Sequence, residues 1–247
     1  MQLNERRIAL PNISCSRADG SSASVVITDS IVADEGTARG STPPWQTAHR
    51  RVRYADIRTF VPVGAWRGLG SAPNMFAIES LMDELALGAK IDPLQFRLDN
   101  LPEDDIRLRA VLNRIAAMVD LKTSLPSDTG RGLACGTYKG ETAVAIVAEV
   151  RVDRKSRHVQ IRKIWCAQDC GRVINPQLVE NQIMGNIIWG CSMALKERLT
   201  VADGAMEQTN FDSYDLLRHD EAPDIETSLV QSDDATPTGV GEAALGP

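Results

Sequence analysis

The spacing of hydrophobic residues predicts three consecutive helices between residues 71 and 119. In the first helix, apolar side chains fall at the i, i+3, i+4, i+7 spacing of one helical face: Ile78, Leu81, Met82 and Leu85. Acidic residues, Glu79 among them, lie between these positions. Ser71 or Asn74 is the expected N-cap, and Gly88 is the expected left-handed residue at the end.

Two further helices are predicted directly after the first. Asp92 is a good N-cap and Pro93 a good first residue for a short helix. One side of this short helix is lined by Leu94, Leu98 and Leu101. The third helix runs from about Glu103 to Val119, and its inward residues are expected to be Leu108, Val111, Leu112 and Ile115.

Extended segments lie on both sides of these helices. Residues 142–153 and 158–169 are rich in β-branched residues and alternate in places, so they predict an antiparallel hairpin joined by residues 154–157. Residues 125–132 are expected to be a loop, and residues 224–233 a last strand. Residues 51–63 are strand-like, and Ser24–Val32 is a candidate short strand.

A long helix is predicted from about Pro176 to Lys196, with Asn175 as its N-cap. Gly185, Asn186 and Gly190 lie inside it, and each glycine there costs roughly 1 kcal/mol relative to alanine. These small residues predict that something packs tightly against that face. Helices combined with a hairpin in this order indicate an α+β fold. We expect residues 1–50 to be poorly structured and residues 51–247 to form one partial domain.

The composition narrows the class of protein. Of the 247 residues, 43% are hydrophobic and 24% are charged, which is typical of a globular chain. The net charge of −6 and the lack of a lysine-rich stripe argue against nucleic-acid binding. No apolar run is long enough for a transmembrane segment, and the N-terminus has no secretory signal pattern. The chain by itself is therefore predicted to be cytoplasmic.

The five cysteines are scattered rather than paired: Cys15, Cys135, Cys166, Cys170 and Cys191. Their odd number and irregular spacing fit neither a disulfide framework nor a metal site. We expect them to be buried free thiols.

Two short glycine-rich stretches carry the candidate chemistry. GAWRGLG, residues 64–70, places Arg67 between glycines, where a guanidinium could reach an anionic group. GVGE, residues 239–242, places Glu242 behind two glycines that would let the backbone approach something bulky. The alternatives are a surface turn with a solvated arginine and a glutamate that is only a turn residue. GVGEAA also imitates a dinucleotide fingerprint, but only six residues follow Gly241, too few for the helix and strand that such a site needs.

Taken together, several stretches resemble the large subunit of molybdenum hydroxylases, the class of xanthine dehydrogenase and aldehyde oxidase. They are residues 61–86, 92–98, 169–195 and 239–242, in family order. The branch they resemble most is that of the beta subunit of isoquinoline 1-oxidoreductase and related bacterial aldehyde dehydrogenases. The resemblance covers residues from about 50 to 247 and does not extend convincingly to residues 1–45.

The resemblance implies a fold of the xanthine oxidase type and a molybdopterin cofactor, in bacteria usually the cytosine dinucleotide form. It also implies oxidation of an aldehyde or an N-heterocyclic aromatic, with water-derived oxygen inserted and hydride passed to a molybdenum sulfido group. The family's glutamate, which removes a proton from the molybdenum-bound hydroxide, matches Glu242. The family's arginine beside the molybdenum ligands matches Arg67.

The resemblance also implies roles for residues next to Arg67 and Glu242. Trp66, Gly68 and Gly241 are expected to contact the cofactor together with Arg67. Leu69 stands where the family has a phenylalanine, so we expect it in the substrate pocket without a stacking platform for a flat ring.

The resemblance also implies missing parts and partners. A full large subunit is roughly three times this length, so we expect the chain to be a C-terminal piece, with nothing able to pack behind Glu242. It would act with the remaining part of the large subunit and with a small subunit that carries two [2Fe–2S] clusters and removes the electrons. Full-length relatives are often exported, which makes the periplasm possible for a complete complex. The alternative is a non-catalytic fragment or an interaction module of such a complex.

Overall fold

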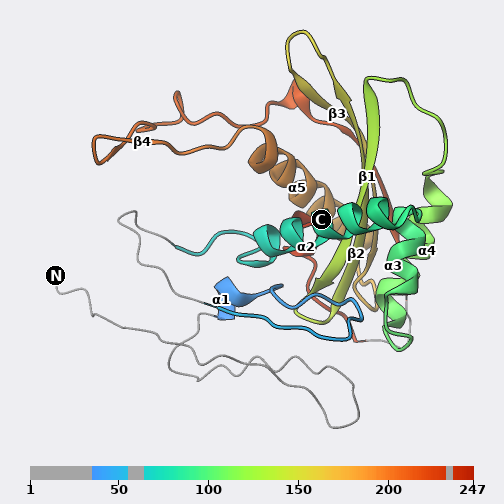
Figure 1. Ribbon diagram of the computed structural model, residues 1–247. Helices are drawn as coiled ribbons and strands as arrows, with labels where there is room; N and C mark the ends of the chain where they lie inside the picture. The colour runs from blue at the N-terminus through green and yellow to red at the C-terminus, as the bar shows by residue number, and fades with distance from the viewer. Residues whose placement is uncertain (1–34, 55–63, 232–235) are drawn as a thin grey trace.

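A four-stranded mixed sheet forms the centre of the computed structural model, which describes residues 35–54, 64–231 and 236–247 (Figure 1). The strand order is β1-β2-β3-β6, with bounds Thr129–Tyr138, Thr142–Val152, Val159–Asp169 and Asp224–Leu229. β1, β2 and β3 are antiparallel neighbours, while β6 pairs with β3 in parallel. The α+β prediction is confirmed.

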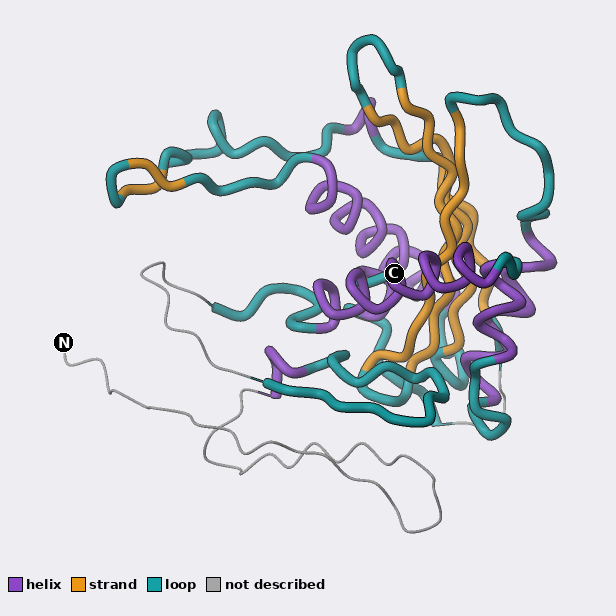
Figure 2. Tube along the Cα trace, in the orientation of Figure 1, coloured by secondary structure: helices purple, strands orange, loops and turns teal. Residues whose placement is uncertain are grey.

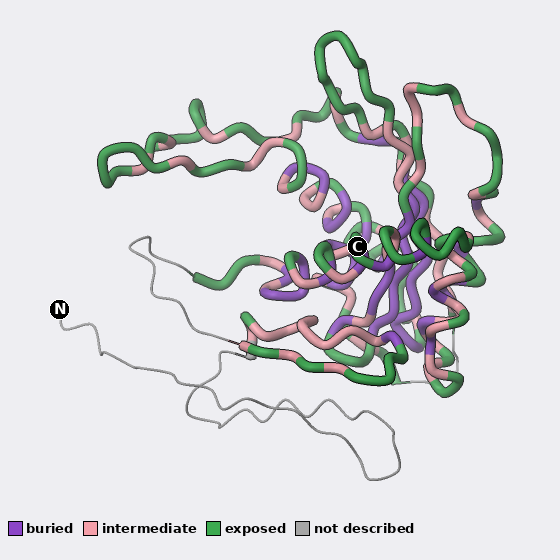
Figure 3. Tube along the Cα trace, in the orientation of Figure 1, coloured by how far each residue is buried: buried purple, intermediate pink, exposed green. Residues whose placement is uncertain are grey.

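The predicted hairpin is confirmed in β2 and β3, and its two faces enter two different cores. On one face, Ala143, Ala145 and Val147 of β2 pack in the core that contains α4. On the other face, Val144 and Ile146 pack in the core that contains α5. Both faces of β2 are covered, so its buried residues are consecutive rather than alternating, as Figure 3 shows for the centre of the sheet.

β1 was not predicted, because its first residues were expected to be a loop. The strand contains Gly130, Gly132 and Gly136 and has no regular hydrophobic alternation. Its pairing with β2 runs without interruption from Thr129 opposite Arg151 to Tyr138 opposite Thr142. Tertiary pairing, rather than local β-propensity, therefore determines this strand.

The first predicted helix forms as α2, Ser71–Ala89, but its buried face differs from the prediction. Leu81 and Leu85 are 54% and 48% exposed. The buried face is instead formed by Ser71, Ala72, Met75, Glu79, Met82 and Ala86. Glu79, taken as a polar position, is only 3% exposed.

The ends of α2 also differ from the prediction. Gly70, rather than Ser71 or Asn74, is the N-cap, and Lys90, rather than Gly88, adopts the left-handed conformation at the end. Gly70 has a steric reason to be glycine, since a Cβ there would lie 1.9 Å from the carbonyl oxygen of Thr37.

The next two helices are confirmed as α3, Pro93–Asp99, and α4, Ile106–Met118. Asp92 caps α3 by accepting from the backbone N–H groups of Leu94 and Gln95. All four predicted inward residues of α4 are completely buried: Leu108, Val111, Leu112 and Ile115. α4 starts about three residues later than predicted, after the N-cap Asp105.

Buried charges connect α2, α3 and β1. The Arg97 guanidinium, fully buried, donates from Nε to Glu79 Oε2 at 2.9 Å. Glu79 also accepts from the backbone N–H of Cys135 at 2.9 Å and from the indole N–H of Trp45 at 3.1 Å. Burial raises the pKa of the Glu79 carboxyl, and the pairing with Arg97 opposes that rise. The Arg97–Glu79 pair is thus a structural link between α2, α3, β1 and the segment that carries Trp45.

The long helix is confirmed as α5, Pro176–Leu195, with Asn175 as its N-cap. Its small residues meet the chain's own C-terminal segment, residues 236–247. A Cβ on Gly190 would lie 3.1 Å from the carbonyl oxygen of Leu245. The tight partner expected for this face is therefore present within the chain.

The remaining described elements are short. α1 (Glu35–Ala38) precedes an irregular segment, and β4 (Val201–Ala202) and β5 (Ala205–Met206) form an arm that projects from the body (Figure 2). η1 (His219–Glu221) precedes β6, and η2 (Ala243–Leu245) lies in the C-terminal segment. The candidate strand at 24–32 and most of the strand-like stretch 51–63 lie outside the described residues, while residues 51–54 are irregular.

Four of the five cysteines lie in the described part of the chain: Cys135, Cys166, Cys170 and Cys191. All four are buried and free, as predicted, whereas Cys15 lies outside the described residues. Within the described residues, no helix is both long and apolar enough to cross a membrane.

Candidate functional site

The C-terminal segment that carries Glu242 is firmly attached to the sheet and to α5. The backbone N–H of Thr238 donates to the carbonyl of Cys170 at 2.8 Å, and the Thr142 hydroxyl donates to the carbonyl of Gly239 at 2.7 Å. The residues of η2, directly after Glu242, are buried. The expectation that nothing could pack behind Glu242 is therefore wrong.

Arg67 joins the two glycine-rich stretches. Its Nε donates to the carbonyl of Gly241 at 2.7 Å, and its Nη2 donates to Oε1 of Gln182 on α5 at 2.9 Å. The guanidinium also lies over the ring of Trp189, 5.7 Å from its centroid. Arg67 therefore fixes the peptide group directly before Glu242, although the two residues are far apart in sequence.

The other residues predicted near Arg67 surround it on the same turn. Trp66 is 48% exposed and meets Trp189 edge to face, with ring centroids 5.3 Å apart. Gly68 has a φ of +85°, and a Cβ there would lie 2.9 Å from Leu245. Leu69 is at the same turn and also has a positive φ, of 50°. This turn thus lies against both α5 and the C-terminal segment.

Of the two uses expected for the glycines of GVGE, a positive φ is absent, and close approach to a bulky group stays a prediction. Neither Gly239 nor Gly241 has a positive φ. No atom of the described residues lies within 4 Å of a Cβ built at either position. The space on the Cβ side of both glycines is therefore open, while their carbonyls accept hydrogen bonds from Arg67 and Thr142.

Glu242 is held by a residue that no sequence pattern indicated. The hydroxyl of Tyr138, at the end of β1, donates to Glu242 Oε2. The same hydroxyl accepts from Nη1 of Arg39 at 2.9 Å, and the Arg39 guanidinium lies 5.4 Å from the ring centroid. Burial, and then the hydrogen bond to Glu242, raise the pKa of Tyr138.

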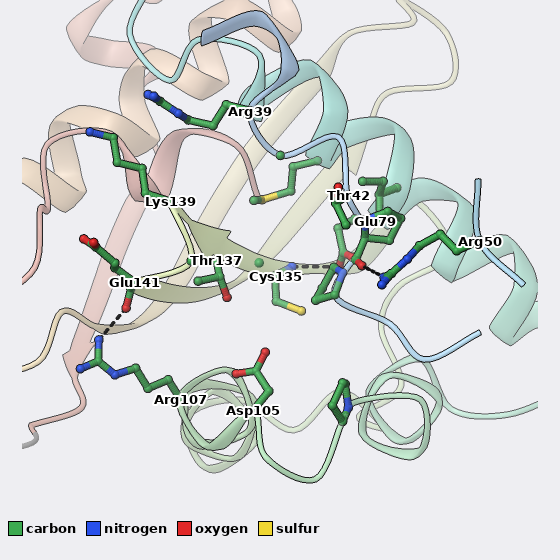
Figure 4. A pocket seen from close by; sticks show the side chains of 18 of the residues that line it. Arg39, Thr42, Arg50, Glu79, Asp105, Arg107, Cys135, Thr137, Lys139 and Glu141 are labelled. Carbon is green, nitrogen blue, oxygen red and sulfur yellow. Dashed lines mark hydrogen bonds between the residues drawn. The ribbon is translucent and has the colours of Figure 1, made fainter. Parts of the chain in front are cut away.

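Arg39 also lines a cavity of about 770 Å³, which Figure 4 shows from close by. Side chains of both charges line the cavity: Arg39, Arg50, Arg107, Lys139, Glu79, Asp104, Asp105 and Glu141. Two polar atoms at its wall, Thr137 Oγ1 and Arg50 Nε, are buried without a hydrogen-bond partner in the described structure. Such orphaned groups are uncommon in proteins and indicate a missing polar partner.

Among the described residues, no group of three or more His, Cys, Asp and Glu side chains is arranged to hold a metal ion. The candidate site is defined by the contacts described above. It consists of Glu242, Tyr138 and Arg39, the Arg67 turn, and the adjoining charged cavity. Tyr138 and Arg39 could not be found in the sequence, because β1 carries no strand pattern and Arg39 lies in a stretch without periodicity.

Comparison with known proteins identifies the family. Residues 22–101 and residues 108–223 each match a molybdopterin cofactor-binding domain. The first match begins well before residue 50, so the likeness extends further towards the N-terminus than the motifs indicated. Arg67 lies inside the first match, whereas Glu242 lies beyond the end of the second.

Curated relatives belong to the same group of proteins. The chain is 37% identical over 215 residues to the beta subunit of isoquinoline 1-oxidoreductase from Brevundimonas diminuta, covering 86% of this chain and 27% of that protein. It is 32% identical over 223 residues to a nicotinate dehydrogenase subunit from Pseudomonas putida, covering 85% and 19%. The chain thus spans about a quarter of the length of these relatives, or less.

Solved structures support the fold. The aldehyde oxidoreductase from Desulfovibrio desulfuricans superposes on 73% of this chain, and on 38% of its own, with a TM-score of 0.61. The corresponding enzyme from Desulfovibrio gigas gives a TM-score of 0.57 over the same shares. Sequence identities of 15% and 14% limit this likeness to the fold. The chain belongs to the molybdopterin-binding large subunits of the molybdenum hydroxylases.

Proposed function

We propose that the chain is part of a molybdopterin-dependent oxidoreductase that oxidises an aldehyde or an N-heterocyclic aromatic compound. The observation that carries the proposal is the 2.7 Å hydrogen bond from Arg67 Nε to the Gly241 carbonyl. This bond brings together two of the stretches on which the family resemblance rests, residues 61–86 and 239–242. Names of curated relatives that include isoquinoline, nicotinate and aldehyde support the substrate class.

The basic side chains of the charged cavity are proposed contacts for an anionic cofactor, next to the four carboxylates that also line it. Arg50, Arg107 and Lys139 would hold phosphate groups of a molybdopterin dinucleotide, with cytosine as its proposed base. The Thr137 hydroxyl and Arg50 Nε, both without partners in the described structure, would gain hydrogen bonds to such a ligand. When bound, the cofactor supplies the redox centre at which the substrate is oxidised.

Glu242 is the proposed general base. A carboxylate suits this role when its geometry is fixed within hydrogen-bond reach of the proton it accepts. The Arg67–Gly241 contact fixes the backbone before it, and the buried η2 residues fix the backbone after it. The open space beside Gly239 and Gly241 leaves room for cofactor and substrate. Trp66, Gly68 and Gly241 are proposed cofactor contacts, and Leu69 a proposed wall of the substrate pocket.

The complete enzyme requires further protein in this proposal. An apolar groove of about 560 Å³ runs between α2, α5 and the C-terminal segment, and Phe76 at its edge is 72% exposed. We propose that the remaining part of the large subunit covers this surface, and that a small [2Fe–2S] subunit receives the electrons. The proposed compartment is the cytoplasm for this chain, or the periplasm for a complete exported complex.

Glu242→Gln in the complex with its partner proteins tests the proposal. The substitution keeps the side-chain shape and removes its basicity. General acid–base catalysis contributes about 10²–10⁴-fold, so turnover should fall at least a hundredfold at unchanged molybdenum content. Glu103→Gln, which alters an exposed glutamate, is the matched control. A Glu242→Gln enzyme that retains more than about half of the wild-type rate would refute the assignment.

A further inference from the structure

Tyr138 and Thr142 occupy the closed end of the β1–β2 hairpin and are directly paired across it. Both side chains reach the C-terminal segment: the Thr142 hydroxyl binds the Gly239 carbonyl, and the Tyr138 hydroxyl binds the Glu242 carboxylate. Tyr138 is only 6% exposed. A rigid element of the sheet therefore holds both ends of the GVGE stretch.

The donors and acceptors in this cluster fix the direction of its hydrogen bonds. A guanidinium has only donors, so the Tyr138 oxygen must accept from Arg39. The single phenolic proton is then left for Glu242 Oε2. The chain of donation runs from Arg39 through Tyr138 to Glu242, and each hydrogen bond polarises the next in the same direction.

We propose that Tyr138, supported by Arg39, is a positioning residue that holds the Glu242 carboxylate through Oε2 and directs its other oxygen to the proton of the reaction. The catalytic part of this inference rests on the proposed role of Glu242 as general base. The hydrogen-bonded cluster itself is a feature of the fold and can be tested without cofactor or turnover.

The charged groups around the Tyr138 hydroxyl have opposite effects on its titration. Glu242 raises the pKa of the phenol because it accepts the phenolic proton and repels the phenolate. Arg39 lowers that pKa because it stabilises the phenolate. The Lys139 ammonium also lies near this ring, 5.9 Å from its centroid.

NMR of the full chain with ¹³Cζ-labelled tyrosine provides the first test. The chain has three tyrosines, and Tyr54→Phe and Tyr214→Phe assign the Tyr138 signal by elimination. Glu242→Gln should move the Tyr138 titration to lower pH, and Arg39→Gln should move it to higher pH. An unchanged Tyr138 titration in Glu242→Gln would overturn the proposal, because the two groups would then share no proton.

Kinetics of the cofactor-loaded complex provide the second test. Tyr138→Phe should lower kcat about ten- to a hundredfold, the effect of one lost hydrogen bond to a charged group, with KM and molybdenum content unchanged. Tyr214→Phe is the matched control, since the Tyr214 hydroxyl donates to a carboxylate of Glu197 at 2.8 Å outside the site. Equal kcat values in Tyr138→Phe and wild type would overturn the positioning role. Absence of turnover in the wild-type complex would instead refute the proposed function and leave the NMR test valid.

Discussion

Arg97→Met should destabilise the fold strongly, because Arg97 is a buried charge paired with a buried carboxylate. The change keeps much of the side-chain volume but removes a guanidinium that is fully buried. It deletes the contacts to Glu79 Oε2 at 2.9 Å and to Asp83 Oδ1 at 2.7 Å. The Glu79 carboxylate, 3% exposed, is left without its countercharge.

Removing one partner of a buried ion pair typically costs about 3–5 kcal/mol. The free energy of unfolding of a whole domain is only about 5–15 kcal/mol, so this is a large fraction of it. With a urea m-value of about 1–3 kcal/mol/M, the midpoint of urea unfolding should fall by at least about 1 M.

The double variant Glu79→Gln/Arg97→Met separates the charge effect from packing. The introduced amide is neutral, and its single oxygen can still accept from either the Cys135 N–H or the Trp45 indole, which donate to different oxygens of Glu79. The urea midpoint of the double variant should therefore lie above that of Arg97→Met alone.

The control is Glu226→Gln, which breaks the Lys163–Glu226 pair at 2.8 Å, where the side chains are 31% and 49% exposed. Surface pairs of this kind contribute about 0–1 kcal/mol. If Arg97→Met loses no more stability than Glu226→Gln, the buried pair is not a structural link between these segments.

Three further predictions concern the site, the C-terminal segment and the thiols. Arg67→Ala loses two hydrogen bonds and should lower turnover or molybdenum occupancy by about ten- to a hundredfold. Arg67→Lys should restore little of this loss, because one ammonium cannot replace the guanidinium fork. Equal turnover and molybdenum occupancy in wild type, Arg67→Ala and Arg67→Lys would refute the contact. Gly190→Val should push the carbonyl of Leu245 away from α5 and speed proteolysis in the C-terminal segment, and an unchanged cleavage rate would contradict that packing. Burial raises the pKa of the Cys166 thiol, and it raises the pKa of the Cys191 thiol to about 11. Neither thiol should therefore react with maleimide at pH 7 until urea unfolds the chain. Rapid labelling of the native protein, detected by mass spectrometry, would contradict their burial.

Local sequence signals predicted the elements with strong periodicity and clear caps. α4 follows its apolar spacing, α3 and α5 follow their Asp92 and Asn175 caps, and the β2–β3 hairpin follows its β-branched runs. The buried face of α2 was wrong because Leu81 and Leu85 are exposed, while Glu79 is buried by a partner on α3 that lies 18 residues away. A buried ion pair cannot be recognised from hydrophobic spacing alone.

The candidate site was predicted only in part, because some of its contacts join residues that are far apart in the sequence. Arg67 and Glu242 were found because each lies in a short glycine-rich motif, and the structure brings their stretches together. Tyr138 and Arg39 were missed because the contacts of Tyr138 with Glu242 and with Arg39 are long-range and involve a strand with no local pattern. Pairing of β1 with β2 creates that part of the site.

Molybdenum content tests the central claim most directly. The chain is purified alone and together with the products of its neighbouring genes, and molybdenum is measured by mass spectrometry against protein concentration. A molybdopterin-binding chain predicts close to stoichiometric molybdenum in at least one of these preparations. Molybdenum absent from both would contradict the proposed function and favour a non-catalytic role for this chain.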